Sequence, residues 1–415
     1  MSKYGNSDRD DPVPEERGSR FRLPVIAWLS VLFFAACTKM SPEDGVARHD
    51  GTLVRLTVSL PQPALPTKGA RAGGLSGDAE NRIEDVMILV LEQENGKYVY
   101  RYMTEGERLE STGSGTQFQA KLLSTSKPVK LMLAGNYGDA FAAYAPSPGH
   151  SEAEVKAEIG CSFTGAAQSL PMYGEIAVPS GLEADRENRF SVKMLRAVAR
   201  IDVEKDLTTD SRPLRIESVR LYRPNDKIQL APDESFAPES PRVTAPSVFA
   251  GAVKSQSPVV TETSEPDPVS IAGIYVPEAD GVADAAARLT EATCIVVGGY
   301  YDGQSQPTYY RVDFDPGLEG HPFGQVLRNY KYVFRIRKVT GPGWSDPGLA
   351  AVNKATSIVA EIEPWEDFTT EMHFEGDNYI GLSSRSVTLG YPAGKADTVD
   401  VQATLPYTCL LYTSP

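Results

Sequence analysis

The chain has 415 residues, of which 41% are hydrophobic and 23% charged, so it can bury more than one core and is expected to form two or three domains. Its formal net charge of -14 argues against nucleic acid and anionic lipid surfaces as partners, because both repel an acidic protein. Only four cysteines are present, too few for a fold that depends on disulfides.

The N-terminal segment has the pattern of a secretory signal. Arginines precede an apolar run at residues 23–36, which is shorter than the roughly 20 residues that a membrane-spanning helix needs. The run ends in Phe-Ala-Ala followed by Cys37, which resembles the lipobox of bacterial lipoproteins. The resemblance implies a signal peptide at residues 1–36, lipidation of Cys37, a tether at 37–50 and a surface-exposed location on the cell outer membrane. The alternative is a soluble secreted protein with a cysteine there by chance.

The first strand predicted after the tether spans residues 54–60. Its aliphatic side chains alternate with polar ones and so share one face of the strand: Val54, Leu56, Val58 and Leu60. Residues 61–78 are rich in Pro, Gly and Ala and are expected to form an exposed, protease-accessible loop. Lys68 and Arg71 lie in this loop.

The next segments contain the clearest hairpin of the chain. An apolar run at residues 86–91 and a tyrosine-rich run at 98–102 flank Asn95-Gly96, a two-residue turn signal. Further strands of the first half are expected at 118–122, 129–133, 190–192 and 198–203.

One helix is predicted among these strands. Ser151 and Glu154 have the spacing of a capping box, in which each side chain bonds to the other residue's backbone N–H. Val155 and Ile159 then share one helix face, and the helix is expected to run through Gly160.

The second half repeats the pattern of short strands. Its strands are expected at 216–222, 274–276, 294–297, 309–314 and 331–336, and the region ends near Trp365. Short strands between turn signals favour a β-sandwich over alternating strands and helices. Polar residues 206–212 mark the expected domain boundary, and residues 232–268, rich in Ser, Pro and Glu, are expected to form a long surface excursion.

No pattern in the sequence indicates an enzyme. None of the four histidines lies in a zinc-binding or nucleophile motif, so we expect no catalytic residue, no metal site and no cofactor. Glu361 and Glu363 share one face of a predicted strand, which leaves glycosidase chemistry as a weaker alternative. Cys161 and Cys294 are expected to be buried thiols rather than a disulfide.

Tyrosines cluster at residues 300–301 and 309–310, each next to turn or glycine residues. Such rings can stack on sugars, but tyrosines in paired strands more often pack across the strands, and we favour that role. Arg328 and Asn329 are likewise expected to satisfy buried carbonyl groups rather than bind a partner.

The C-terminal part starts a further module. Residues 386–389 and 398–403 alternate like the opening hairpin of an Ig-like or BACON-like domain, and the segment 375–408 is too short to close a core. Residues 409–415 resemble an adapter-derived string and are interpreted as a non-native tail, so Cys409 carries no weight.

Several short strings, in this order, resemble the fimbrillin superfamily of type V pili. They lie at 170–175, 195–201, 275–278, 297–301, 309–314, 326–332 and 341–344. The resemblance covers residues 51–374. It implies an all-β fold of two tandem β-sandwich domains with transthyretin-like or Greek-key topology, at 51–206 and 207–374, followed by the truncated module.

The resemblance also implies a mechanism of assembly. An arginine-directed protease would cut the Arg71-Ala72 bond, with Lys68 as the lesser candidate, and the released strand would be the one that carries Val54 and its neighbours. The groove left behind would accept a strand of another fimbrial subunit, because unpaired N–H and C=O groups and an apolar slot are relieved by pairing. A leading strand paired on both sides, together with a buried and unreachable Arg71, would contradict this expectation.

Two readings of function remain open. The first is a structural or adhesive fimbrial subunit, with a host or bacterial surface receptor or glycan as a second partner. Because a further module follows the two domains, it is expected to be a tip or accessory subunit. The alternative is a surface glycan-binding lipoprotein built of β-sandwich modules that captures polysaccharide through exposed aromatic rings.

Overall fold

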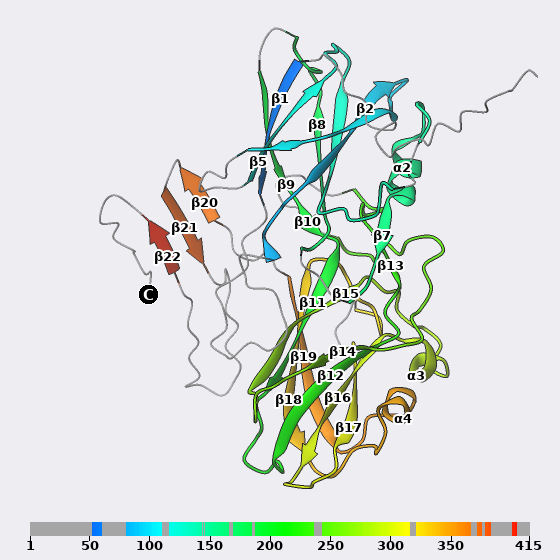
Figure 1. The fold of residues 1–415 in the computed structure, drawn as a ribbon, viewed down its shortest axis with the longest axis vertical. Coiled ribbons are helices and arrows are strands. Elements are labelled where there is room, and N and C mark those ends of the chain that lie inside the picture. The colour runs from blue at the N-terminus through cyan, green and yellow to red at the C-terminus, as the bar shows by residue number, and fades with distance from the viewer. Residues whose placement is uncertain are drawn as a thin grey trace, which may run out of the picture. The chain divides into compact units, whose positions relative to one another are not determined.

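The computed structural model describes residues 52–59, 80–109, 116–142, 144, 146–165, 169–184, 187–235, 243–315, 321–366, 372–375, 378–382 and 401–404. All of them belong to one compact unit, residues 42–415. They fold mainly into strands, which form two successive β-sandwiches and a small third sheet (Figure 1). The prediction of an all-β protein with two tandem β-sandwiches is confirmed.

The first sandwich contains a four-stranded and a five-stranded sheet. The strand orders are β4-β5-β1-β9 and β10-β8-β6-β2-β3. The strands are β1 (Thr52–Ser59), β2 (Val86–Glu94), β3 (Lys97–Glu105), β4 (Glu107–Arg108), β5 (Thr116–Leu122), β6 (Val129–Gly135), β8 (Met172–Val178), β9 (Asn188–Lys193) and β10 (Leu195–Arg196). Aliphatic residues of both sheets share one buried core, among them Val54, Leu89 and Leu131.

Strands β2 and β3 form the predicted hairpin. Asn95 and Gly96 connect them with φ values of 49° and 80°. Both values lie in the left-handed region that a type I′ turn requires, which is why the Asn-Gly pair identifies this turn. The hairpin pairs with β6 through β2, so β3 is an edge strand of the five-stranded sheet.

The predicted helix is α2 (Glu152–Glu158), and its capping box is present. The Ser151 side chain accepts a hydrogen bond from the Glu154 backbone N–H, and the Glu154 carboxylate accepts one from the Ser151 N–H at 2.7 Å. The helix ends before the expected Gly160, because that residue begins β7 (Gly160–Ser162), which pairs with β13 (Lys227–Gln229).

The second sandwich contains two four-stranded sheets, with orders β15-β11-β18-β19 and β14-β12-β16-β17. Two short helices, α3 (Arg288–Glu291) and α4 (Pro347–Val352), lie in its connections. The strands are β11 (Val198–Lys205), β12 (Leu214–Tyr222), β14 (Val259–Glu262), β15 (Ser270–Pro277), β16 (Cys294–Tyr301), β17 (Thr308–Asp313), β18 (Tyr330–Val339) and β19 (Ile358–Glu366).

The boundary between the sandwiches lies earlier than the sequence predicted. Strand β11 pairs with β15 and β18, so residues 198–205 belong to the second sandwich and not to a first domain that ends at residue 206. The polar residues 206–212 connect β11 to β12 within that sandwich. A polar stretch marks any exposed connection, and here it did not mark a domain boundary.

The expected excursion at residues 232–268 is in part integrated into the fold. Strand β14 pairs with β12, and Val243 and Ser247 are buried. A segment rich in Ser, Pro and Glu can still be fixed at a few buried positions, and its composition does not show which positions these are.

The third sheet consists of β20 (Met372–Glu375), β21 (Asn378–Leu382) and β22 (Val401–Thr404), all antiparallel. Residues 372–374, expected to belong to the second sandwich domain, pair with β21 in this sheet. The expected strand at 386–389, the start of the one at 398–403 and the tail at 409–415 lie outside the described residues.

Candidate strand-exchange site

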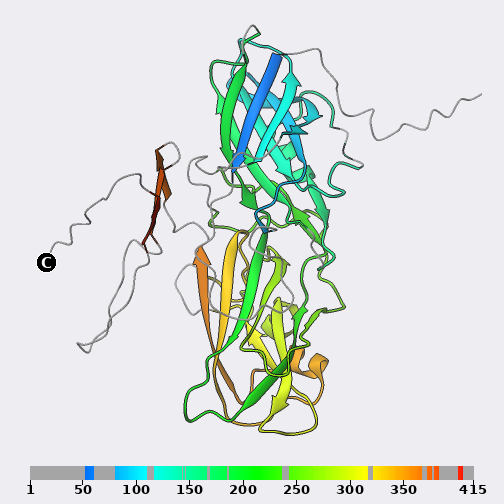
Figure 2. The ribbon, with the colours of Figure 1, turned by 60° about the vertical axis from the view of Figure 1, so that its left-hand side comes forward.

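Strand β1 occupies an interior position in its sheet. It pairs antiparallel with β5, from Thr52 opposite Leu122 to Val58 opposite Thr116. On its other side it pairs parallel with β9, from Val54 opposite Asn188 onward. Figure 2 shows β1, in blue, between a cyan and a green strand of the same sheet. The ladder on each side would therefore be broken by removal of this one strand.

The predicted alternation of β1 is confirmed by burial. Val54, Leu56 and Val58 are fully buried in the core of the first sandwich, whereas Leu53 is 36% exposed. Three buried aliphatic side chains of this size contribute about 5 to 9 kcal/mol to stability. The fourth expected residue, Leu60, lies outside the described residues.

Polar contacts hold the start of β1 to the segment before β9. The Thr52 hydroxyl donates to the Glu183 carbonyl at 2.6 Å and accepts from Asn188 Nδ2 at 3.2 Å. Arg55 Nε lies 2.8 Å from Glu187 Oε1, an ion pair without the alignment of a hydrogen bond. The hydrogen bonds of Thr52 are buried or partly buried and join residues 131 and 136 positions apart. The Arg55–Glu187 pair is partly exposed, so it adds less to the retention of β1 than the buried aliphatic face does.

Two observations together would contradict strand exchange: a leading strand paired on both sides and a buried Arg71. The pairing of β1 with both β5 and β9 is the first of these. The second concerns Arg71, which with Ala72, Lys68 and Cys37 lies outside the described residues. Pairing on both sides does not by itself prevent exchange. It means that departure of β1 would leave a slot with two unpaired strand edges, and an incoming strand could satisfy both.

The chain that follows this segment is fixed at Glu80, a 4% exposed residue. Its carboxylate accepts hydrogen bonds at 2.6 Å from Arg200 Nη1 and from the Tyr275 hydroxyl, both on strands of the second sandwich. Next to it, Asn81 Oδ1 accepts from Arg196 Nη2 at 2.5 Å. We refer to Glu80 with Arg200 and Tyr275 as the Glu80 anchor.

The Glu80 anchor is part of a charged network. Arg200 donates to Asp202 at 2.8 and 3.0 Å, and Lys331 Nζ lies 3.1 Å from Asp202. Burial alone would lower the pKa of Arg200, but the carboxylates of Asp202 and Glu80 outweigh it and hold that pKa above its usual value. Burial opposes ionisation of Asp202, yet Arg200 and Lys331 hold its pKa below the usual range. The network thus keeps its charges over a wide pH range.

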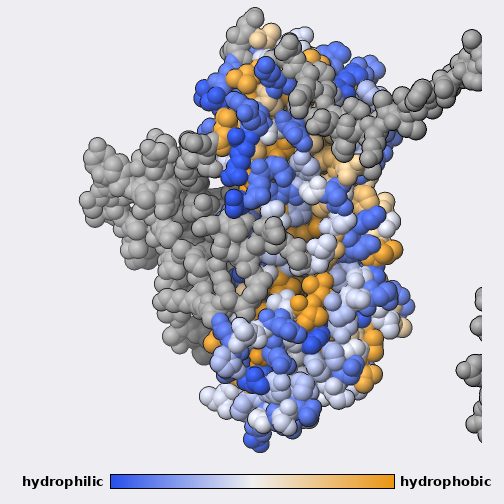
Figure 3. Space-filling view, in the orientation of Figure 1, coloured by the Kyte–Doolittle hydropathy of each residue, from blue (hydrophilic) through white to orange (hydrophobic). Residues whose placement is uncertain are grey.

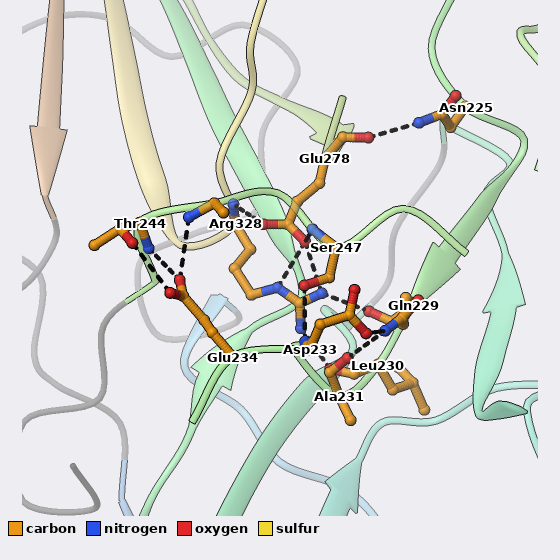
Figure 4. Close-up of polar contacts among 11 residues, drawn as sticks. Asn225, Gln229, Leu230, Ala231, Asp233, Glu234, Thr244, Ser247, Glu278 and Arg328 are labelled. Atoms are coloured by element: carbon orange, nitrogen blue, oxygen red, sulfur yellow. Dashed lines mark hydrogen bonds and ion pairs between the residues drawn. The ribbon is translucent and has the colours of Figure 1, made fainter. Parts of the chain in front are cut away.

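A second polar cluster centres on Arg328 and Glu278. Arg328 Nη2 and Nε donate to Glu278 Oε2 at 2.7 and 2.8 Å. Arg328 also donates to the backbone carbonyls of Leu230 and Gln229, which Figure 4 shows converging on the guanidinium. Glu278 Oε2 accepts from the Ser247 N–H at 3.0 Å. The expected structural role of Arg328 is confirmed.

The tyrosine strings pack within the second sandwich. Tyr310 is buried, and Tyr309 lies opposite Gly298 across β16 and β17. Arg215 covers the ring of Tyr300 at 4.0 Å from its centroid. Cross-strand packing, the role favoured from the sequence, accounts for these rings.

The remaining expectations concern thiols, metals and membranes. Cys161 and Cys294 are free and buried, and burial raises the pKa of Cys161 to about 12. Within the described ranges, no group of three or more His, Cys, Asp or Glu residues is placed to hold a metal ion. No helix in that part of the chain is long and apolar enough to span a membrane.

Sequence reasoning identified β1 and the structural role of Arg328, but it missed the Glu80 anchor and the pairing of Arg328 with Glu278. Glu80, Arg200 and Glu278 are single charged residues in strands or connections, and no spacing in the sequence sets them apart from solvated surface charges. The contacts of Glu80 with Arg200 and Tyr275, and of Glu278 with Arg328, join residues 50 to 195 positions apart, so only the folded chain brings them together.

No protein-family model matches the chain, and no curated protein gives a significant match. Several solved structures are similar to it. A candidate cell adhesion protein from Parabacteroides distasonis has a TM-score of 0.48 and 14% identity, covering 76% of this chain and 99% of its own. The tip fimbrial protein Mfa3 from Porphyromonas gingivalis, with a C-terminal truncation, has a TM-score of 0.42 and 15% identity at the same coverages.

A fimbrial assembly protein from Parabacteroides distasonis has a TM-score of 0.40 and 14% identity, covering 69% of this chain and 90% of its own. The TM-scores of these three likenesses lie below 0.5, so no role, family or partner is transferred from them to this chain.

Proposed function

We propose that this protein is a non-catalytic, structural or adhesive subunit of a cell-surface fimbria and assembles by strand exchange. The observation that carries the proposal is the position of β1, an interior strand with three fully buried aliphatic residues, Val54, Leu56 and Val58. Release of β1 would open a slot with an apolar floor and two unpaired edges. A strand of another fimbrial subunit with the same alternation fits that slot.

The energy of β1 supports a requirement for cleavage. Its buried face contributes about 5 to 9 kcal/mol, a large part of the stability of an ordinary domain. An uncut chain would therefore keep β1 in place. Cutting the Arg71-Ala72 bond would make the strand a separate molecule that a competing strand can replace.

The Glu80 anchor supports the same division of the chain. Residues from Glu80 onward are held by Arg200 and Tyr275 of the second sandwich. A cut at Arg71 would separate β1 and leave this anchor in the main body. Lipidation of Cys37 would tie the uncut protein to the outer membrane, and the cut would also separate the main body of the protein from this lipid.

Small hydrophobic groups on the surface are consistent with this mode of association. On the face shown in Figure 3, hydrophilic residues predominate and hydrophobic ones form scattered groups.

The third sheet, β20 to β22, follows the second sandwich and supports a tip or accessory role, because it adds a module beyond the two sandwiches.

The test uses a disulfide that locks β1 in place. Arg55 and Gln119 are direct partners across β1 and β5, and Arg55→Cys with Gln119→Cys would link them. The background carries Cys37→Ser. After digestion with an arginine-specific protease, a fluorescent peptide of residues 52–60 should exchange into the cut protein, and N-terminal sequencing should read from Ala72.

The locked variant should take up no peptide until it is reduced. A matched control, Glu94→Cys with Lys97→Cys, places a disulfide across the β2–β3 hairpin and should leave exchange unchanged. Equal uptake by the oxidised locked variant, or no uptake by the cut unlocked protein, would overturn the proposal.

A further inference from the structure

The second sandwich contains a cavity of about 870 Å³ that strand exchange does not use. It is lined by the end of β12, the connection that includes Lys254, residues 280–284 and 290–291, and helix α4. Three acidic residues of its lining are exposed and form the rim: Asp280, Asp284 and Glu291. A volume of this size accommodates a ligand of one or two sugar rings.

Two cationic side chains line the cavity, and both are bound only to neutral groups. Lys254 Nζ donates to the Thr293 hydroxyl at 2.9 Å. Arg223 donates to the carbonyls of Ala292 and Ala351 at 2.8 and 3.0 Å, and to Cys294 Sγ. Among the described residues, no carboxylate lies within ion-pair distance of either cation.

This arrangement is unusual for partly buried cations. Buried charges in proteins are normally paired, because desolvation without a counter-charge is unfavourable. The Arg328 and Glu278 cluster of this same chain follows that rule. Burial lowers the pKa of Lys254 to about 8, an effect that Asp280 opposes and Arg223 reinforces. An anionic group of a ligand would supply the missing counter-charge.

We propose that this cavity binds a small acidic sugar, with its carboxylate at Lys254 and Arg223. The rim carboxylates of Asp280, Asp284 and Glu291 would accept hydrogen bonds from the hydroxyls of the sugar. The same rim, together with a net charge of -14, disfavours ligands with many negative charges, such as sulfated polysaccharides. A ligand with one carboxylate and several hydroxyls matches both the two cations inside the cavity and the carboxylates on its rim.

Calorimetric titration of the whole protein with glucuronic acid and N-acetylneuraminic acid tests the proposal, with glucose as the neutral probe. At pH 6.5 an acidic sugar should bind at least tenfold more tightly than glucose. Lys254→Met should weaken this binding by tenfold or more, whereas Lys97→Met, an exposed lysine on β3, should not change it. Circular dichroism would verify that both variants fold.

A pH series separates a charge at Lys254 from general packing. Binding of the acidic sugar should be constant between about pH 6 and 7, where all carboxyl groups of the site and the sugar are ionised, and fall about tenfold or more by pH 9.5, because Lys254 loses its proton through about pH 8. Binding of glucose should change little. Absence of binding by both acidic sugars, equal binding of glucose, or an unchanged affinity in Lys254→Met would each overturn the inference. Uptake of the β1 peptide by Lys254→Met reports on the proposed assembly separately.

Discussion

Arg328 and Glu278 form an ion pair in which the side chains are 0% and 3% exposed and Nη2 lies 2.7 Å from Oε2. Two features make this burial tolerable. The guanidinium also donates to the carbonyls of Leu230 and Gln229, and the carboxylate also accepts from the backbone N–H of Arg328. A buried pair with its remaining donors and acceptors satisfied avoids most of the desolvation cost.

Breaking this pair should be strongly destabilising. Arg328→Met leaves the Glu278 carboxylate buried without its counter-charge and should lower the free energy of unfolding by about 3 to 5 kcal/mol. Urea unfolding measures the change. Arg82→Met provides the control, because Arg82 and Glu84 are 59% and 49% exposed and such pairs contribute less than about 1 kcal/mol. Similar losses in the two variants would contradict the role assigned to Arg328.

Strand β1 offers a comparison between its two faces. Leu56→Ala removes a fully buried side chain and should cost about 2 to 5 kcal/mol, whereas Leu53→Ala, at a 36% exposed position of the same strand, should cost under about 1 kcal/mol. The same substitutions in the 52–60 peptide should weaken its uptake by the cut protein in the same order. Equal uptake of both peptides would show that the buried face of β1 does not direct exchange.

Two glycines with positive φ should respond differently to alanine. Gly181 has φ +75°, and an added Cβ would lie 2.1 Å from the Thr125 carbonyl oxygen, which belongs to the backbone and cannot easily move. Gly181→Ala should therefore cost about 3 kcal/mol or more. Gly96 has φ +80° but nothing within 4 Å, so Gly96→Ala should cost about 1 kcal/mol from strain alone. Thermal unfolding measures the loss of stability in both variants, and a larger loss in Gly96→Ala than in Gly181→Ala would contradict the prediction.

The charge of Lys254 should destabilise the folded protein. Burial lowers the pKa of Lys254 from the usual 10.5 to about 8 in the folded protein, so below pH 8 the folded chain buries a charge that the unfolded chain exposes. Lys254→Met should raise the free energy of unfolding by about 1 to 3 kcal/mol at pH 7.

This gain should shrink as the pH rises from 8 to 10.5, because the folded protein then loses the Lys254 proton before the unfolded chain does. Unfolding curves of both proteins across this range measure the effect. A gain that does not change with pH would point to apolar packing of the new methionine instead of a removed charge.

The elements that could be predicted from sequence are those set by local pattern. The period-2 alternation around Leu56 predicted β1, Asn95-Gly96 predicted the hairpin, and Ser151 with Glu154 predicted the start of α2. Each depends on residues within a few positions of one another, where backbone geometry links side-chain spacing to structure.

What could not be predicted depends on contacts between distant segments. The parallel pairing of β1 with β9 joins residues more than 130 positions apart, and nothing in either strand selects the other. The partners of Glu80 are equally remote. The boundary before β11 was missed because the distant partners of β11 decide which sheet the strand joins. Lys254 lies in a segment expected to be an excursion, and only its unpaired charge beside a cavity sets it apart.

The neighbours of β1 give it a direction as well as a place. It runs against β5 and along β9, so reversing a replacement strand would alter the hydrogen-bond pattern on both sides. If every subunit received its neighbour in the orientation of β1, each contact would join two different surfaces in a head-to-tail chain. The resulting filament would have polarity, with one terminus offering an empty receptor slot and the other an unused donor.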